Sequence, residues 1–171
     1  AGAVRGRLRG EMRQLLLLRH AKSSWDDPSL PDHARPLNAR GRRAAQAMAA
    51  AMHDLGLSPD VVLVSSARRT LQTLEAVSPF PDSPLVEPMD DIYLAPWPRL
   101  LDILRQAPET ARSVMLIGHN PGLHDLALAL VGAAGMGGAP AASARRMADG
   151  FPTCALAEFA IATPWRDLAE G

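Results

Sequence analysis

Three runs of four apolar residues stand out along the chain, at residues 15–18, 61–64 and 114–117. Short runs of this kind, bounded by polar residues or glycine, are typical of fully buried strands. Segments with helical spacing of their apolar residues follow each run, and strands that alternate with helices favour a parallel sheet. The pattern therefore predicts an α/β fold, namely a three-layer α/β/α sandwich with a mostly parallel central sheet and helices on both faces.

The helices predicted by this pattern cover residues 39–55, 67–77, 97–107 and 121–132. Asn38 precedes the first of them and Asn120 the last, and asparagine is a favoured N-cap residue. Pro121 would then take the first helical position, where the backbone N–H has no partner within the helix and proline is therefore tolerated. A closing strand is predicted within residues 152–162, with Cys154 as a buried and inert thiol.

Three segments lack a regular pattern. Residues 23–36 are polar, residues 79–88 hold four prolines, and residues 132–150 are rich in small side chains. Glycine and proline interrupt helices and strands alike. We therefore expect loops in all three, with a mobile loop at residues 132–150 in which Arg145 and Arg146 are solvated.

Length and composition indicate one domain. The chain has 171 residues, of which 47% are apolar, and this suits a single compact core. We predict one domain over residues 12–171 and an N-terminal extension over residues 1–11, where Met12 could be the natural start. The apolar helix faces could pack internally or against a partner, so the oligomeric state is left open.

The charge balance disfavours two classes of partner. Eighteen basic and 18 acidic side chains give a formal net charge of zero, so neither nucleic acid nor an anionic membrane is expected to bind. No apolar run approaches the roughly 20 residues that span a bilayer. The single cysteine cannot form an internal disulfide, and a reducing cytoplasm is the predicted location.

Chemistry-bearing residues fall directly after the three buried strands. They are Arg19 and His20 after the first, Ser65, Ser66, Arg68 and Arg69 after the second, and Gly118, His119 and Asn120 after the third. In open parallel sheets, ligands bind outside the carboxyl ends of the strands. Two histidines with two or three arginines, beside helix N-termini, suit a compact dianion such as a phosphoryl group.

The histidines also have structural and metal-binding interpretations. A histidine at one strand end is more often structural than catalytic, but the coincidence at three strand ends favours a site. Metal binding by His20 and His119 lacks an H-x-x-x-H spacing or a carboxylate cluster, and arginines would repel a cation. No metal and no cofactor are therefore predicted, and His33, His53 and His124 are assigned to the background.

The segments "LLLLRHAKSSW", "VLVSSARRTLQT" and "MLIGHNPGL", in this order, resemble the histidine phosphatase superfamily, also called phosphoglycerate-mutase-like. The superfamily signature is Arg-His-Gly, whereas Ala21 follows Arg19 and His20 here. This departure, the "GHNPG" form and the short chain are similar to the small SixA-type phosphohistidine phosphatases. The resemblance covers roughly residues 15–165 and implies the three-layer α/β fold.

When the superfamily's functional residues are matched to this chain by position, the resemblance implies that His20 is the nucleophile. It also implies that Arg19, Arg69 and a protonated His119 hold the phosphoryl oxygens. Arg69 fits the Ser-x-x-x-Arg-x-x-x-Thr pattern that runs from Ser65 to Thr73, and Arg68 does not. We expect Ser23 and Asn120 to contact the substrate as well.

Many superfamily members use a mid-chain carboxyl group to protonate the leaving group. The candidates here are Glu87, Asp90 and Asp91, and none follows the usual pattern well, so Asp90 or Asp91 is the predicted acid. A weak or absent acid would suit a good leaving group such as the imidazole of phosphohistidine.

The resemblance thus implies a metal-independent phosphatase that transfers a phosphoryl group to His20 and then to water. Its partner would be a phosphorylated small molecule or a phosphohistidine protein. Two alternatives remain open: a phosphoglycerate-mutase-like phosphotransferase, and a phosphate or phosphopeptide binding module without turnover.

Overall fold

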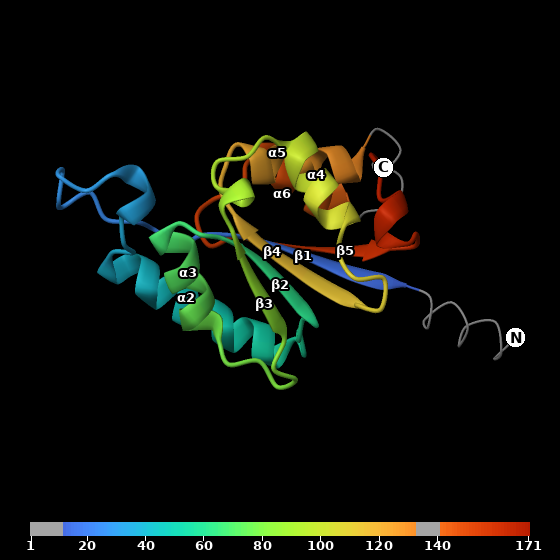
Figure 1. The fold of residues 1–171 in the computed structure, drawn as a ribbon, viewed down its shortest axis with the longest axis horizontal. Coiled ribbons are helices and arrows are strands. Elements are labelled where there is room, and N and C mark those ends of the chain that lie inside the picture. The colour runs from blue at the N-terminus through green and yellow to red at the C-terminus, as the bar shows by residue number, and fades with distance from the viewer. Residues whose placement is uncertain (1–11, 133–140) are drawn as a thin grey trace, which may run out of the picture.

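A five-stranded mixed sheet forms the middle layer of the computed structural model, which describes residues 12–132 and 141–171 (Figure 1). The strand order is β3-β2-β4-β1-β5, in which β5 runs antiparallel to β1 and the other neighbours are parallel. The strands are β1 (Arg13–Arg19), β2 (Val61–Ser65), β3 (Leu85–Met89), β4 (Ser113–Gly118) and β5 (Leu156–Ile161). The predicted α/β class with a mostly parallel sheet is confirmed.

Helices cover both faces of this sheet (Figure 1). One face carries α2 (Ala39–Asp54) and α3 (Arg68–Val77), and the other carries α4 (Trp97–Arg105), α5 (Gly122–Val131) and α6 (Ala141–Asp149). Short 3-10 turns complete the described chain: η1 (Asp32–Ala34), η2 (Asp90–Ile92) and η4 (Trp165–Asp167).

Alternate residues of the central strands belong to two separate hydrophobic cores, one on each face of the sheet. Leu15 and Leu17 join the core under α4 and α5, whereas Leu16 and Leu18 join the core under α2 and α3. All four leucines are 0% exposed. Because β1 has a neighbour on each side and a helix layer on each face, a continuous apolar run is what this position requires.

Strand β3 was not predicted from the sequence. It pairs in parallel with β2 at the edge of the sheet, and its residues are mostly exposed. Such a strand carries no apolar run, and Pro88 is tolerated because edge strands can leave a backbone N–H unpaired.

The expected loop at residues 132–150 is corrected in part, since Ala141–Asp149 forms helix α6. Alanine, arginine and methionine have high helix propensity, and this outweighs the run of small residues. The rest of that prediction, over residues 133–140, lies outside the described residues, as does the predicted extension at residues 1–11.

Two local predictions shift by one or more residues. Helix α5 begins at Gly122 with Pro121 as its N-cap, so Asn120 is not the capping residue. Cys154 lies in a turn before β5, with a φ of 62°, rather than in the strand. The Asn38 cap is confirmed, because its side chain accepts a hydrogen bond of 2.7 Å from the Gly41 N–H.

Gly122 marks a close approach between α5 and the segment before α4. A Cβ atom at this position would lie 1.9 Å from the carbonyl oxygen of Ala95, well inside van der Waals contact. Within the described residues, no helix is long and apolar enough to cross a membrane.

Candidate active site

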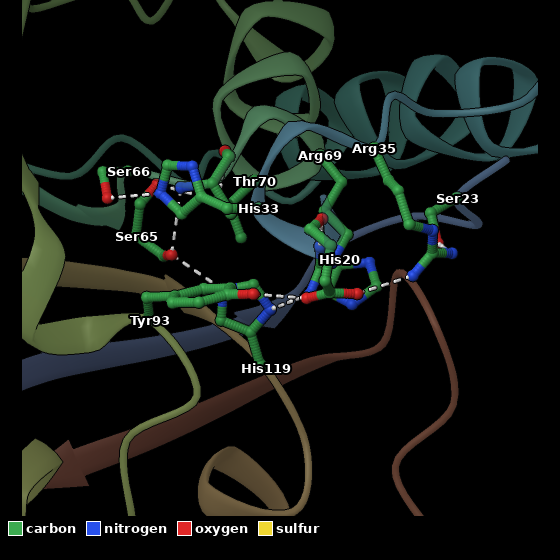
Figure 2. A network of polar contacts seen from close by, with 12 residues as sticks. His20, Ser23, His33, Arg35, Ser65, Ser66, Arg69, Thr70, Tyr93 and His119 are labelled. Atoms are coloured by element: carbon green, nitrogen blue, oxygen red, sulfur yellow. Dashed lines mark hydrogen bonds and ion pairs between the residues drawn. The ribbon is translucent and has the colours of Figure 1, made fainter. Parts of the chain in front are cut away.

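The carboxyl ends of β1, β2 and β4 bring three polar residues together (Figure 2). His20 follows β1, Ser65 ends β2, and His119 follows β4, which lies between the other two strands. The imidazole ring centroids of His20 and His119 are 5.3 Å apart. The predicted convergence of these strand ends is therefore present in the fold.

The ring of His20 is held in one tautomer. Its Nδ1 lies 2.7 Å from the carbonyl oxygen of Ala21, and because a carbonyl only accepts, Nδ1 must carry the proton. In the neutral ring this leaves the lone pair on Nε2. The Ala21 N–H donates to Thr73 Oγ1 at 3.0 Å, and Thr73 donates to the Arg69 carbonyl at 2.7 Å, so α3 anchors the segment that carries His20.

The hydrogen bonds of His119 also determine its tautomer. A guanidinium group only donates, so the 3.3 Å contact from Arg69 Nη2 makes Nδ1 of His119 an acceptor. Its Nε2 then carries the proton and donates to Ser65 Oγ at 2.7 Å. Ser65 thereby orients the ring in a pocket where His119 is 3% exposed.

Arg69 makes three hydrogen bonds from its buried side chain. It is 4% exposed, and its Nη1 and Nη2 donate to the carbonyl oxygen and the Oδ2 of Asp32 at 2.8 and 3.0 Å. The neighbouring Arg68 is exposed, because successive residues of a helix point about 100° apart. The sequence assignment of Arg69 rather than Arg68 agrees with this placement.

Three residues of this cluster were not identified from the sequence: Asp32, Arg35 and Tyr93. Arg35 Nη1 donates to Asp32 Oδ1 at 2.9 Å, and the Tyr93 hydroxyl donates to Asp32 Oδ2. Arg35 is 7% exposed although it lies in a polar loop. The spacing of Asp32 and Arg35 was a usable signal for an ion pair, but nothing in the pattern shows that the loop folds back over the sheet.

Ser23 and Asn120, both predicted to bind substrate, take structural partners here. Ser23 Oγ accepts from Arg35 Nη2 at 2.6 Å, so Ser23 lies behind that guanidinium. Asn120 Nδ2 and Arg19 Nη1 both donate to the carbonyl oxygen of Phe151, at 2.7 and 3.0 Å. The Nε atom of Arg19 and the Oδ1 atom of Asn120 are buried and have no hydrogen-bond partner among residues 12–132 and 141–171.

The carboxyl groups proposed as general acids are already engaged. Asp90 accepts a hydrogen bond of 2.5 Å from the Ser66 hydroxyl, which also lies 2.9 Å from Nε2 of His33. Asp91 forms an ion pair with Arg99 of α4. His33, assigned to the background from the sequence, therefore lies at the rim of the site, with its ring 4.8 Å from that of Tyr93.

The chain matches the model of the histidine phosphatase superfamily (branch 1) over residues 15–119, more than half of its length. It belongs to the histidine phosphatase superfamily. A chloroplastic protein of Arabidopsis thaliana is 35% identical over 71% of this chain, which spans 60% of that relative's length.

Solved structures place the chain in the SixA-type branch of the superfamily. A protein of Agrobacterium tumefaciens, named as a SixA phosphohistidine phosphatase, is 31% identical with a TM-score of 0.75, over 85% of this chain and 90% of that chain. A SixA structure complexed with tungstate is 26% identical with a TM-score of 0.60, over 68% and 76% of the two chains. The resemblance proposed from the sequence is thus confirmed, and the chain is a phosphatase by family.

Positive charge predominates in this phosphatase site. Three guanidinium groups, those of Arg19, Arg35 and Arg69, act on the pKa of His20, and Asp32 is the carboxylate that contacts Arg35 and Arg69. Hydrogen bonds from Tyr93 above all, and also from the two arginines, hold the pKa of Asp32 well below its usual range. An excess of fixed cations over carboxylates suits a dianionic ligand.

The same surroundings keep both imidazoles neutral. Burial, reinforced by the nearby guanidinium groups and opposed by the Ala21 carbonyl, lowers the pKa of His20 to about 4. Burial and the charge of Arg69 lower the pKa of His119 to about 3. Without an anion the ring of His119 accepts a hydrogen bond from a cation and is neutral, and its protonation when a phosphoryl group is bound stays a prediction. Within the described residues, no group of three or more His, Cys, Asp or Glu side chains could hold a metal ion.

We predict that Asp32→Asn destabilises the fold by about 2 kcal/mol, because it leaves two buried guanidinium groups without their carboxylate; this figure is discounted for the partial exposure of Asp32. Inorganic phosphate should raise the melting temperature of the variant more than that of the wild type, because the oxyanion supplies the missing negative charge. Thermal unfolding with and without phosphate tests this.

The control for that experiment is Asp27→Asn. Asp27 lies in the same loop, and its carboxylate contacts Ser29, so this variant should match the wild type. Equal phosphate effects on the wild type and on Asp32→Asn would contradict the assigned role of Asp32.

We also predict that His20 and His119 stay neutral from pH 8 down to about pH 5. Unfolded histidine has a pKa of about 6.5, so the unfolded chain binds protons first, and the stability of the fold should decrease as the pH falls below about 6.5. Imidazole ¹⁵N shifts measured by NMR, assigned with His20→Asn and His119→Asn, test this. Midpoints between pH 6 and 7 without added anion would contradict the electrostatic account, and tungstate should raise both pKa values.

Proposed function

We propose that this phosphatase hydrolyses phosphohistidine by way of a covalent phosphoryl group on His20. The observation that carries the proposal is the environment of the His20 ring: Nδ1 donates to the Ala21 carbonyl, and Nε2 is left as a nucleophile near three guanidinium groups. A low pKa keeps this ring neutral, and therefore nucleophilic, throughout the physiological pH range.

In the first step, the Nε2 lone pair of His20 forms a bond to phosphorus while the bond between phosphorus and the leaving nitrogen breaks. The electron pair of that bond stays on the departing nitrogen, and the ring leaves as neutral imidazole when its other nitrogen carries a proton. In the second step, water attacks the phosphoryl group, the bond from phosphorus to Nε2 breaks, and its electrons return to the His20 ring. The proton lost by water ends on the phosphate product or on solvent.

Stabilisation of the three non-bridging oxygens falls to the arginines. Arg69 and Arg35 would transfer hydrogen bonds from Asp32 to the incoming phosphoryl group, and Arg19 would transfer one from the Phe151 carbonyl. Arg35 and Arg69 are both buried, and fixed donors on buried side chains have a strong electrostatic effect. The tungstate complex of a SixA relative supports an oxyanion site in this branch.

The substrate class is argued from the leaving group. Asp90 and Asp91 hydrogen-bond to Ser66 and Arg99, and Asp32 is strongly held in its ionised form. Among the described residues, none of these three carboxyl groups is therefore poised to protonate an alkoxide at neutral pH. Imidazole is a far better leaving group than an alkoxide, and the SixA relatives carry the name of phosphohistidine phosphatases; both points favour phosphohistidine over sugar or alkyl phosphates.

We predict that brief reaction with an aryl phosphate, quenched at alkaline pH, leaves a phosphoryl group on His20 that mass spectrometry can map. The His20→Ala variant should lack this adduct and lose turnover by at least about a thousandfold. His53→Ala is the matched control, since His53 is exposed on α2. If His20→Ala retains phosphate binding and the wild type has neither adduct nor turnover, the chain is a binding module, and transfer to a supplied sugar or glycerate acceptor would indicate a mutase.

We further predict a steep dependence of kcat/KM on the leaving group. Phosphohistidine and nitrophenyl phosphate should be hydrolysed at least about a hundredfold faster than an alkyl phosphate, because nothing offsets the charge on a departing alkoxide. Initial rates over a series of phosphate esters with graded leaving-group pKa test this. A flat profile would show that a general acid operates, and Asp90→Asn and Asp91→Asn would then identify it.

A further inference from the structure

Strand β5 is an edge strand, and its open side has a defined set of backbone groups. Along β1, the N–H groups of Gln14 and His20 donate toward β4, to Arg112 and Gly118, whereas that of Arg19 donates toward β5, to Ala155. Backbone groups of successive strand residues point to opposite sides. The odd-numbered residues of β1 therefore face β5, and the even-numbered residues face β4.

The register then identifies the outward groups of β5. Ala157, Phe159 and Ile161 pair with odd-numbered residues of β1, so their N–H and C=O groups face inward. Leu156, Glu158 and Ala160 present theirs to the opposite side, away from β1, and β5 has no second neighbour among the strands that the structure describes. Among the described residues, no backbone hydrogen bond outside the β1 ladder engages these three residues.

A groove runs beside this open edge. A cavity of about 500 Å³ lies between α6 and β5, bounded by Arg146, Met147, Leu156 and Glu158 among others. A second cavity of about 530 Å³ includes Arg19, Asn120 and His124. Both share Arg146, Gly150, Phe151 and Pro152. The two cavities therefore adjoin at these four residues, and we call them together the edge groove, which extends from Arg19, the chain neighbour of His20, to β5.

We propose that the edge groove binds an extended segment of a phosphohistidine protein, which adds to β5 as a further strand next to the phosphorylated residue. This inference rests on the proposed function. The unpaired N–H and C=O groups of β5 specify the occupant, because a row of main-chain donors and acceptors is complemented by another polypeptide strand and not by a sugar or a single amino acid.

The directions of the strands would bring a segment bound at the edge of β5 close to His20. Because β5 is antiparallel to β1, its first residue, Leu156, pairs with Leu18, just before Arg19 and His20. A segment on the edge of β5 therefore has one end near the catalytic centre. At about 3.3 Å per residue, a phosphohistidine two or three residues beyond the paired segment could reach across the second cavity to His20. Phe151 and Pro152, with Met147, supply apolar contact along the way.

Glu158→Pro tests this inference, because proline removes the outward N–H of residue 158 and leaves the pairing with β1 intact. Glu158→Ala is the matched control, since it removes the carboxylate and its 2.8 Å contact with Gln14 but keeps the N–H. For each protein, kcat/KM would be measured with a phosphohistidine peptide of about eight residues and with free phosphohistidine. The ratio of the two values should be well above one in the wild type and in Glu158→Ala, and about tenfold lower in Glu158→Pro.

Hydrogen exchange gives a second readout that does not depend on a proline variant. In His20→Ala mixed with the phosphohistidine peptide, the amides of Leu156, Glu158 and Ala160 should exchange more slowly than in the variant alone. Unchanged exchange, or equal peptide ratios in Glu158→Pro and Glu158→Ala, would overturn the inference. If light scattering shows a dimer that only Glu158→Pro disrupts, a second copy of this chain occupies the edge instead.

The kcat/KM values of the wild type also distinguish a failure of this inference from a failure of the proposed function. If the wild type hydrolyses free phosphohistidine and the peptide with equal kcat/KM, the function stands and the edge groove does not bind the substrate. If the wild type hydrolyses neither phosphohistidine compound, the proposed function fails, and the docking inference fails with it.

Discussion

The burial of the Arg69 guanidinium group is the constraint on which the site depends. A cation that is 4% exposed needs acceptors for its N–H groups, and a buried charge without them is strongly destabilising. Asp32 supplies two of these acceptors and His119 a third. Arg69 therefore links helix α3 by hydrogen bonds to the loop before α2 and to the end of β4. It also determines the tautomer of His119.

The same constraint couples stability to binding. Asp32 and a phosphoryl group are both anions, and both suit the donors of Arg69 and Arg35. In the absence of ligand the carboxylate balances the guanidinium charges, which lets these side chains be buried and correctly oriented in advance. A dianion carries more charge and more acceptor oxygens than one carboxylate, so it can displace Asp32 from these donors while the framework stays fixed by Tyr93 and the Asp32 backbone carbonyl.

Residues that follow buried strands could be predicted from the sequence, because an apolar run marks both the strand and the place where it ends. This reasoning located His20, His119 and the pair Arg68 and Arg69, of which the resemblance to the superfamily selected Arg69, and the fold brings His20, Arg69 and His119 together. Arg35 and Tyr93 could not be found in this way, because their positions follow from how two irregular segments fold over the sheet. Strand β3 and helix α6 were missed for related reasons: an exposed edge strand has no apolar run, and small residues obscured a helix.

Ala21 stands directly after His20, where the superfamily signature has glycine, and its contacts explain why alanine fits. Ala21 is 0% exposed, its methyl group belongs to the core under α2 and α3, and its N–H donates to Thr73. Its carbonyl oxygen fixes the tautomer of His20. Both backbone groups thus position His20 while the side chain packs into the core, so the position tolerates a methyl group that fills space and leaves the hydrogen bonds unchanged. Since the hydrogen bonds come from the backbone, the signature residue can vary while the geometry of His20 is retained.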